Sequence, residues 1–520
     1  MRKDIEAHRA YAAFRDEDNV GEMTRPRKTS SRLWMLTALC LAVVGALVLW
    51  PPPLGTRTAT MASTTTTRTT VEQDVDVGEA VDLTTFLPDR VQEGRDACRV
   101  PNDVLGGEDS WACLATVNET AQNKLFWWFV PPVNEAAKAQ RKKAAPELEP
   151  MTIILWLQGG PGSSSLFGMF GEMGPFGLGP DLQLSPREWT WARKYGMLFV
   201  DNPAGTGFSV AEKGEYCDNT REQVSQQLVS LLRSFYTTFP ELRKGKLVVA
   251  GESYGGHYTM GLSALLAKQD FVPFLGVSAG NAWIDPVHHV PRYPDVMYNL
   301  GIISAVERAR IEDYTARATA LIKAGRMSEA FTVWDAMING DLLGAPSYFA
   351  NVTGLTDYFN YMRMEEPPSE DLFGKFVDQP HVRKGIHVGS IPFGAHSRDV
   401  EMALRGDFMV SFRPEVEALL EASVPVLIYN GMLDVIIHPV LTAGMLERLE
   451  FPDAASYRAE PQRIWKDKKG VVAGYWKHAG SLTSVVLRGA GHMVPADQPE
   501  HAFHLIDTFI ERASAAVQDN

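Results

Sequence analysis

The stretch KLVVAGESYGGHY (Lys246–Tyr258) predicts a strand, a sharp turn and a helix in direct succession. Leu247–Ala250 is an apolar run typical of a buried strand, and Gly256–Lys268 is compatible with a helix and lacks proline. Between them, GESYG (Gly251–Gly255) has the form G-x-S-x-G, in which small residues on both sides of a serine leave room for a strained turn. Ser253 is therefore predicted to be a nucleophile. An ordinary strand-to-helix loop is the alternative interpretation.

A serine hydroxyl needs a general base, and the base needs a group that orients it. His492 lies in the glycine-rich stretch Gly489–Pro495 near the C-terminus, which favours it over the other histidines among the 12 of the chain. Asp434 follows a predicted buried strand, where a carboxylate can orient an imidazole. A turn-forming aspartate is the alternative. The chain order Ser253, Asp434, His492 is that of the α/β-hydrolase fold and predicts a catalytic triad.

Catalysis at a carbonyl also needs backbone donors for the developing oxyanion. One predicted donor is the N–H of Tyr254, directly after the nucleophile. The other is the N–H of Gly160, in the loop Gly159–Gly162 that follows an early strand. A phosphate-binding role for this loop is disfavoured, because the loop lacks the Lys-Ser/Thr ending of a P-loop.

Apolar runs alternate with helical patterns along most of the chain, which favours a mostly parallel central sheet with helices on both faces. A helix is predicted over Glu222–Phe239. Residues from about 285 to 380 break the alternation, with a helical pattern over Val306–Ile338, and are predicted to form an inserted helical cap over the site. The other predicted strands are Leu125–Val130, Thr152–Leu157, Met197–Val200, Phe274–Ser278, Val424–Tyr429 and Ser484–Leu487.

Composition limits the function classes. The chain has 520 residues, 45% hydrophobic and 22% charged, which is typical of a globular protein. Its formal net charge of -13 argues against nucleic acid as a partner. No group of residues has the spacing of metal ligands, so neither a metal nor a cofactor is expected.

The N-terminal region predicts a membrane anchor. Residues 33–50 carry no charge, follow a basic cluster and have a tryptophan near each end. As a helix they would extend ~27 Å, enough to cross a hydrocarbon core. Residues 1–32 are then a cytosolic tail, 51–75 a Thr-rich luminal stalk, and 76–520 the luminal catalytic domain of a type II membrane protein in the secretory or endosomal-lysosomal system. Secretion after cleavage of a signal peptide is the alternative.

A luminal location gives meaning to the cysteines and to two sequons. Cys98 and Cys113 are close in sequence and can pair, although Cys217 leaves the pairing open. Asn118 and Asn351 begin N-x-T triplets and are predicted glycosylation acceptors.

Five blocks resemble the serine carboxypeptidase family. They occur in the family's order and spread over most of residues 110–515: WLQGGPGSSS from Trp156, DNPAGTGFS from Asp201, GESYGGHY from Gly251, LIYNGMLD from Leu427 and GHMVPADQP from Gly491.

The resemblance implies cleavage of the C-terminal residue of peptides or proteins through an acyl-enzyme on Ser253. It also implies that Glu172, Glu252 and Gln158 recognise the substrate's terminal carboxylate. The family's usual asparagine is Gln158 here, which resembles the vitellogenic-type branch. Two glutamates facing a third carboxylate must share protons, so activity favoured at acidic pH is expected. Met493, beside His492, is expected to line the pocket for the leaving residue, with plain loop packing as the alternative.

Three other functions stay open at this point. Some members of the family resemble hydrolases but act as acyltransferases, which the carboxylate-binding pair disfavours. A non-catalytic scaffolding or protective role is disfavoured by the intact triad. An esterase or lipase would share the triad and would cleave esters but not peptides. The oligomeric state and the preferred side chains cannot be deduced from the sequence.

Overall fold

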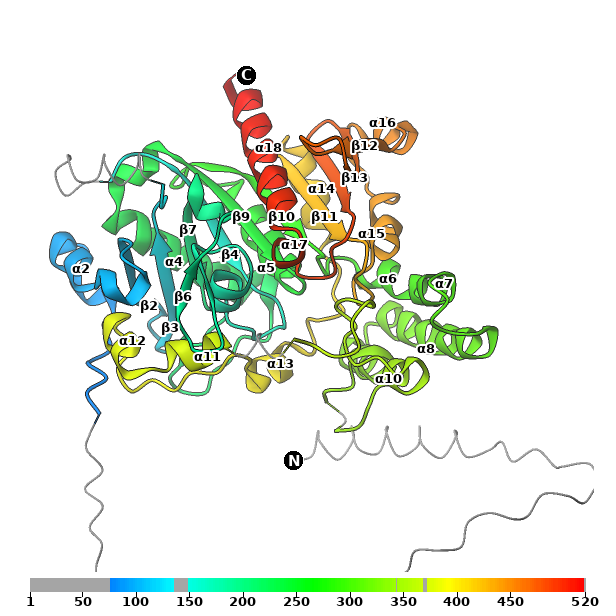
Figure 1. Ribbon diagram of the computed structural model, residues 1–520, viewed down its shortest axis with the longest axis horizontal. Helices are drawn as coiled ribbons and strands as arrows, with labels where there is room; N and C mark the ends of the chain where they lie inside the picture. The colour runs from blue at the N-terminus through cyan, green and yellow to red at the C-terminus, as the bar shows by residue number, and fades with distance from the viewer. Residues whose placement is uncertain (1–74, 135–147, 343, 368–371, 519–520) are drawn as a thin grey trace, which may run out of the picture. The chain divides into compact units, whose positions relative to one another are not determined.

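The computed structural model describes residues 75–134, 148–342, 344–367 and 372–518. Twelve strands of these residues form one sheet, in the order β1-β2-β3-β7-β4-β9-β10-β11-β14-β13-β12, with β8 paired to β3 (Figure 1). The strands are β1 Arg99–Val100, β2 Ser110–Asn118, β3 Asn123–Val130, β4 Thr152–Leu157, β7 Gly196–Val200, β8 Val210–Ala211, β9 Lys246–Glu252, β10 Phe274–Gly280, β11 Val426–Gly431, β12 Arg463–Lys466, β13 Val472–Ala479 and β14 Leu482–Leu487. A separate two-stranded ribbon joins β5 Phe176–Leu178 to β6 Leu184–Pro186.

The centre of the sheet is parallel and its two edges are antiparallel. The strands from β7 through β4, β9, β10 and β11 to β14 pair in parallel, whereas β1, β2, β3, β12 and β13 pair antiparallel to their neighbours. The predicted mostly parallel sheet is thus confirmed. Every predicted strand is present, and their ends differ from the prediction by no more than a few residues.

Both faces of the sheet are covered, as the alternation of side chains along β11 demonstrates. Leu427 and Tyr429 belong to one buried cluster, and Val426 and Ile428 belong to another. Because successive side chains of a strand point to opposite faces, the two clusters lie on opposite sides of the sheet. Helix α18 (Pro499–Gln518) packs into the first cluster. Helices α5 (Gly255–Leu266), α14 (Arg413–Glu421) and α15 (Pro439–Leu446) pack into the second.

The predicted helix over Glu222–Phe239 is α4 (Ser225–Thr238), preceded by a turn of π-helix, η5 (Thr220–Val224). Asn219 caps this π-helical turn, because its side chain accepts a hydrogen bond from the N–H of Glu222 at 2.9 Å.

All the helices of the predicted cap region lie between β10 and β11. The first helices of this region are α6 (Pro286–His289), η7 (Val290–Arg292), α7 (Tyr293–Asn299), α8 (Ala305–Lys323), α9 (Met327–Trp334), η8 (Asp335–Asn339) and α10 (Tyr348–Thr353). The helical pattern predicted over Val306–Ile338 is therefore broken into pieces, and Gly325, with a φ of 73°, separates α8 from α9. Helices α7, α8 and α10 lie together beside α6 (Figure 1).

The end of this region returns to the sheet. Helices α11 (Leu372–Val377) and α12 (Pro380–Gly385) lie beside the strands β2 and β3 (Figure 1). Their side chains Phe373, Phe376 and Val382 join the first buried cluster. Two further short helices complete the stretch before β11, α13 (Arg398–Leu404) and α14.

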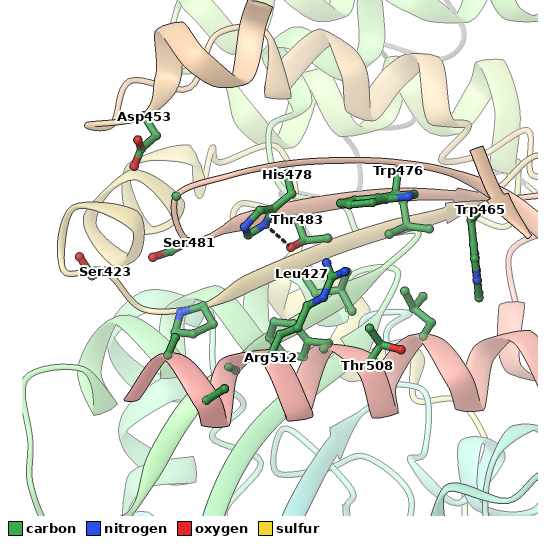
Figure 2. A pocket seen from close by; sticks show the side chains of 18 of the residues that line it. Ser423, Leu427, Asp453, Trp465, Trp476, His478, Ser481, Thr483, Thr508 and Arg512 are labelled. Carbon is green, nitrogen blue, oxygen red and sulfur yellow. Dashed lines mark hydrogen bonds between the residues drawn. The ribbon is translucent and has the colours of Figure 1, made fainter. Parts of the chain in front are cut away.

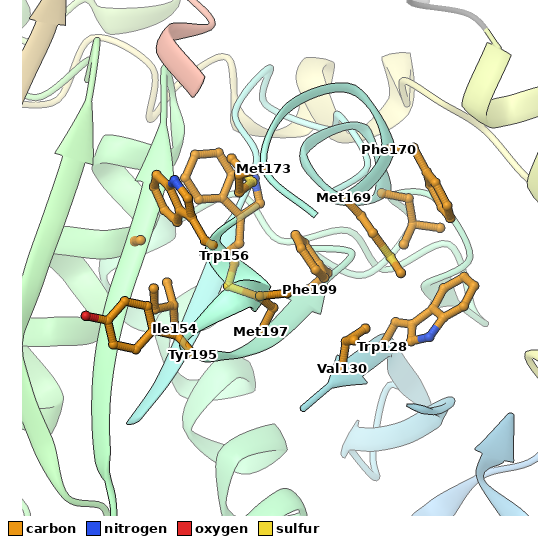
Figure 3. Packing of buried hydrophobic residues seen from close by; sticks show 14 of the residues in the cluster. Trp128, Val130, Ile154, Trp156, Met169, Phe170, Met173, Tyr195, Met197 and Phe199 are labelled. Carbon is orange, nitrogen blue, oxygen red and sulfur yellow. The ribbon is translucent and has the colours of Figure 1, made fainter. Parts of the chain in front are cut away.

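The first buried cluster supports a short π-helix that carries part of the site, η3 (Gly168–Glu172). Figure 3 shows Met169, Phe170 and Met173 packed over Trp128 and Trp156 of the strands beneath. The guanidinium of Arg187 closes the next turn by donating to the carbonyl oxygens of Phe170, Gly174 and Phe176 at 2.7–3.0 Å. The position of the helix thus follows from packing of large side chains and from one half-buried arginine.

The structure tests only some of the predictions about the cysteines, the glycosylation acceptors and the membrane anchor. A disulfide joins Cys98 to Cys113, one of the pairings that the sequence left open, and Cys217 is a buried free cysteine. Asn118 and Asn351 are exposed, and their glycosylation stays a prediction. The predicted cytosolic tail, anchor at 33–50 and stalk up to residue 74 lie outside the described residues. Within the described ranges, no helix is long and apolar enough to cross a membrane.

Candidate active site

The turn after β9 has the strained geometry that its sequence predicts. Ser253 has a φ of 60°, in the left-handed region that non-glycine residues rarely adopt. A Cβ on Gly251 or Gly255 would lie 2.6 or 2.5 Å from the carbonyl oxygen of Leu157, so both positions require glycine. The backbone of Ser253 donates to Gly280 at 3.2 Å and accepts from Trp283 at 2.8 Å. These bonds hold the strained conformation in place.

The fold brings the predicted residues to one edge of the sheet. Ser253 follows β9, Asp434 follows β11, His492 follows β14, and Gly160 follows β4. Parallel strands end at the same edge, which is where open α/β sheets place their ligands. Residues separated by more than 300 positions in the sequence therefore meet in one site.

Asp434 and His492 form a directly bonded, buried pair. His492 Nδ1 lies 2.8 Å from Asp434 Oδ2, and the two residues are 3% and 0% exposed. A carboxylate only accepts, so Nδ1 carries the proton and Nε2 has a free lone pair. Nε2 has no hydrogen-bond partner within the described part of the chain. His492 and Ser253 line the same cavity, of about 360 Å³.

The two predicted oxyanion donors lie beside Ser253. A Cβ on Gly159 would lie 2.6 Å from Ser253 Cβ and 2.7 Å from the backbone nitrogen of Tyr254, so the loop approaches the serine as closely as a backbone can. Among the described residues, no group accepts a hydrogen bond from the N–H of Gly160 or of Tyr254. Both residues line the cavity, so these donors are available to a bound oxygen.

Gln158, Glu172 and Glu252 form a second buried cluster. Gln158 Nε2 donates to Glu172 Oε1 at 3.3 Å and to Glu252 Oε1 at 3.1 Å. Its Oε1 accepts from the indole nitrogen of Trp156 at 2.8 Å, which fixes the orientation of the amide. The two glutamates are each 1% exposed. Gln158 and Glu252 line the cavity of Ser253, and Glu172 lies directly behind Gln158.

Burial sets the charge of this cluster. It raises the pKa of Glu172 to about 7, and the hydrogen bonds from Glu252 and Gln158 oppose the rise. The pKa of Glu252 is raised well above its ordinary value, first by burial and then by the neighbouring Glu172. The pair therefore holds at least one proton below neutral pH, and this proton can be donated to an acceptor.

Sequence reasoning missed two residues that position this machinery. Asn281, at the end of β10, donates to Asp434 Oδ2 at 2.6 Å and accepts from the N–H of Gly431 at 3.1 Å. Asp407, from the region before β11, accepts from the hydroxyl of Tyr254 at 2.8 Å and lies 3.5 Å from Nδ1 of the buried His257. Asn281 follows a predicted strand at the edge where the site forms, which was a usable signal. Asp407 had none.

Met493 lines the cavity, as expected for a pocket residue, and is 7% exposed. A larger cavity of about 800 Å³ lies elsewhere, between α18 and the strands β11, β13 and β14 (Figure 2). His478 in that cavity is hydrogen-bonded to Thr483 at 2.9 Å, and no residue predicted for catalysis lines it. We therefore place the chemistry in the smaller cavity, which holds the strained serine and the paired histidine.

Comparison with known proteins identifies the family. The family model described as serine carboxypeptidase matches residues 108–512, and the chain therefore belongs to the serine carboxypeptidase family. Its class is that of serine-type carboxypeptidases, which are hydrolases.

Individual relatives extend the match over most of the chain. The chain is 35% identical over 443 residues to the vitellogenic carboxypeptidase of Aedes aegypti, covering 84% of this chain and 90% of that protein. It is 34% identical over 443 residues to the probable serine carboxypeptidase CPVL of Homo sapiens, with the same coverage. The crystal structure of Kex1(delta)p, a prohormone-processing carboxypeptidase from Saccharomyces cerevisiae, matches with a TM-score of 0.67 and 21% identity, over 80% of this chain and 96% of that chain, and supports the fold.

Proposed function

We propose that this protein hydrolyses the C-terminal peptide bond of peptides or proteins through an acyl-enzyme on Ser253, most effectively at acidic pH. The observation that carries the proposal is the arrangement of two clusters in one site. The strained Ser253 and the bonded pair Asp434–His492 supply nucleophile and base. The buried cluster of Gln158 and two glutamates supplies donors for a carboxylate.

Acylation would begin with the peptide's terminal carboxylate accepting the proton shared by Glu172 and Glu252, while Gln158 Nε2 holds both glutamates in place. His492 Nε2 then takes the proton of Ser253 Oγ as this oxygen attacks the scissile carbonyl carbon. The N–H groups of Gly160 and Tyr254 stabilise the resulting oxyanion.

The intermediate collapses when His492 donates its proton to the leaving nitrogen, which releases the C-terminal amino acid. A water molecule then attacks the ester carbonyl while His492 Nε2 accepts its proton. As the second tetrahedral intermediate collapses, His492 returns this proton to Ser253 Oγ, and the shortened peptide is released. Asp434 remains ionised and stabilises the imidazolium in both half-reactions.

The acidic optimum follows from the protonation of the glutamates. Below a pH of about 7, Glu172 keeps its proton, and the pair can donate to a substrate carboxylate. As the pH rises through that value, the pair gains negative charge and repels the substrate. We therefore expect KM to rise towards alkaline pH.

We also propose that the catalytic domain works in an oxidising, luminal or extracellular compartment. The disulfide Cys98–Cys113 supports this, because disulfides persist there and are rare in the cytosol. The exposed acceptors Asn118 and Asn351 are compatible with it. The anchor predicted at 33–50 would make the protein a single-pass membrane protein, with secretion as the alternative.

The test uses the full chain from a secretory host, beside Ser253→Ala. Both receive an N-blocked dipeptide and its C-terminal amide from about pH 4 to about pH 7.5, and release of the amino acid or its amide is measured. We expect release from the free acid by the wild type alone, strongest at low pH. Equal activity on the amide would refute carboxylate recognition. Absence of release, with a folded protein that transfers an acyl group to a small alcohol, would favour an acyltransferase.

A further inference from the structure

The cavity that holds Ser253 carries acidic residues that the proposed mechanism does not use. Asp341, Glu366 and Glu401 line it, and no lysine or arginine is among the described residues that do so. Two histidines are among the described residues that line the cavity: His492 and His396. The Nδ1 atom of His396 is hydrogen-bonded to Ser163 Oγ at 3.2 Å. The wall is therefore rich in carboxylates and poor in cations.

These carboxylates gather around one side chain. Tyr358 lines the cavity and donates its hydroxyl hydrogen to Asn339 Oδ1. Burial raises the pKa of Tyr358, and the charges of Asp341, Glu366, Asp335 and Glu401 raise it further. All four carboxyl groups thus act on the same small region of the wall. The nearest histidine nitrogen to Glu401 is His396 Nε2, at 3.5 Å.

Asp335 adjoins Asp341 but does not line the cavity itself. It is fully buried at the start of η8. Its Oδ1 accepts from the N–H of Gly340 at 3.2 Å, but its Oδ2 has no hydrogen-bond donor within the described part of the chain. Burial and the adjacent Asp341 raise the pKa of Asp335 to about 9. Asp335 therefore keeps its proton, and a shared proton relieves the repulsion between two adjacent acids.

An aromatic wall leads from the nucleophile to this acidic region. The ring of Tyr254, the residue after Ser253, stacks on the ring of Phe408 with their centroids 5.3 Å apart. The ring centroids of Phe408 and Trp334 are 4.9 Å apart. Trp334 directly precedes Asp335 in the chain. A lysine or arginine side chain could lay its methylene stem along these rings and place its charged end among the carboxylates.

The position of the acidic region indicates which substrate residue it meets. The glutamate cluster proposed to bind the substrate carboxylate lies on the side of Phe167, because Phe167 directly precedes the π-helix that contains Glu172. Phe167, Phe373 and Met493 also line an adjoining cavity. None of Tyr254, Phe408 or Trp334 lines that adjoining cavity. The leaving residue would occupy the Phe167 side, and the residue that acylates Ser253 would occupy the Trp334 side.

We infer that this protein prefers peptides whose penultimate residue is lysine or arginine, recognised by Asp341 together with Glu401 on the acyl side of Ser253. The inference rests on the proposed carboxypeptidase function and specifies its substrate class.

The test compares three N-blocked dipeptides that end in leucine, with lysine, norleucine or glutamate before it. Norleucine matches the stem of lysine without the charge. We expect kcat/KM about tenfold higher for lysine than for norleucine and about tenfold lower for glutamate, as favourable and unfavourable interactions of a unit charge predict. Asp341→Asn should reduce the lysine preference several-fold. Glu312→Gln is the matched control, because Glu312 lies on the cap helix α8, pairs with Arg308 and does not line the cavity.

A ratio of lysine to norleucine of one or less would overturn the inference. So would an unchanged ratio in Asp341→Asn, or a preference that appears only for N-blocked norleucyl-lysine, where the charge is on the leaving residue. If no dipeptide is cleaved, the proposed function fails instead. Binding of the same dipeptides to Ser253→Ala, measured by calorimetry, then decides the charge preference separately, and equal affinities for lysine and norleucine would overturn it.

Discussion

Asp434 and the pair Glu172–Glu252 are all buried carboxyl groups beside Ser253, yet their hydrogen bonding differs. Asp434 Oδ2 accepts hydrogen bonds from His492 Nδ1 and Asn281 Nδ2. Asp434 Oδ1 accepts one from the N–H of Ile437, at a nitrogen-to-oxygen distance of 3.1 Å. In each of the two glutamates, Oε1 accepts from Gln158, while Oε2 has no donor within the described residues. Buried polar groups are nearly always satisfied. The comparison teaches that the Asp434 side is assembled in advance, whereas the glutamate side is completed by a proton and by a ligand.

The largest effect on activity should come from a substitution in the hydrogen-bonded pair of Asp434 and His492. Asp434→Asn places an amide opposite His492 Nδ1 and favours the wrong tautomer, so we expect kcat to fall about 10⁴-fold with little change in KM. Steady-state kinetics on an N-blocked dipeptide measure this. A loss below tenfold would mean that Asp434 does not orient the base. An unchanged thermal unfolding midpoint would show that the fold is intact.

Removing the residue that holds Asp434 should have a smaller effect of the same kind. Asn281→Ala deletes the 2.6 Å bond to Asp434 and leaves the N–H of Gly431 without its acceptor. We expect kcat to fall about 10- to 100-fold while KM is kept, as for other supporting residues of an active site. A rise in KM with unchanged kcat would place Asn281 in substrate binding instead.

In the cluster of Gln158 and the two glutamates, Gln158→Ala should affect substrate binding more than turnover. The variant loses the donor that faces both glutamates and the acceptor of Trp156. Because a hydrogen bond to a charged group contributes about 1.5–3 kcal/mol, we expect KM for a free-acid dipeptide to rise roughly 10- to 100-fold. The matched C-terminal amide should be hydrolysed equally poorly by both proteins. Equal loss on both substrates would argue for a structural role.

The smallest change is expected from Glu172→Gln, and it concerns pH. In the wild type the folded-state pKa of Glu172 is raised from 4.5 to about 7, so the folded protein holds a proton that the unfolded chain loses between these values. The free energy of unfolding should therefore fall as the pH rises through this window, by about 1 kcal/mol per pH unit from this group. Glu172→Gln should flatten this slope and make KM less dependent on pH. Denaturant unfolding at about pH 5 and pH 7 measures it, and a slope equal to that of the wild type would contradict the assignment.

Much of the fold was predictable because its signals are local. Thr152–Leu157 is a continuous apolar run and forms β4 within the same bounds. The strands β2 and β13 were not predicted. Trp111 to Thr116 of β2 pairs residue by residue with β3, and β13 pairs with β14. Each pair is a hairpin of strands that follow one another in the chain, so these strands were missed although their partners adjoin them. The break between α8 and α9 was also missed, although Gly325 marks it.

By itself, the sequence determined the strand-turn-helix around Ser253 and the order in which the proposed nucleophile, acid and base occur. These features depend on glycines at fixed spacing and on short apolar runs, which act within a few residues of one another. Only the tertiary structure placed Asn281 against Asp434 and Asp407 against Tyr254. The physical reason is that burial and charge proximity arise from packing between distant segments, and these decide which carboxyl groups are ionised and which keep a proton.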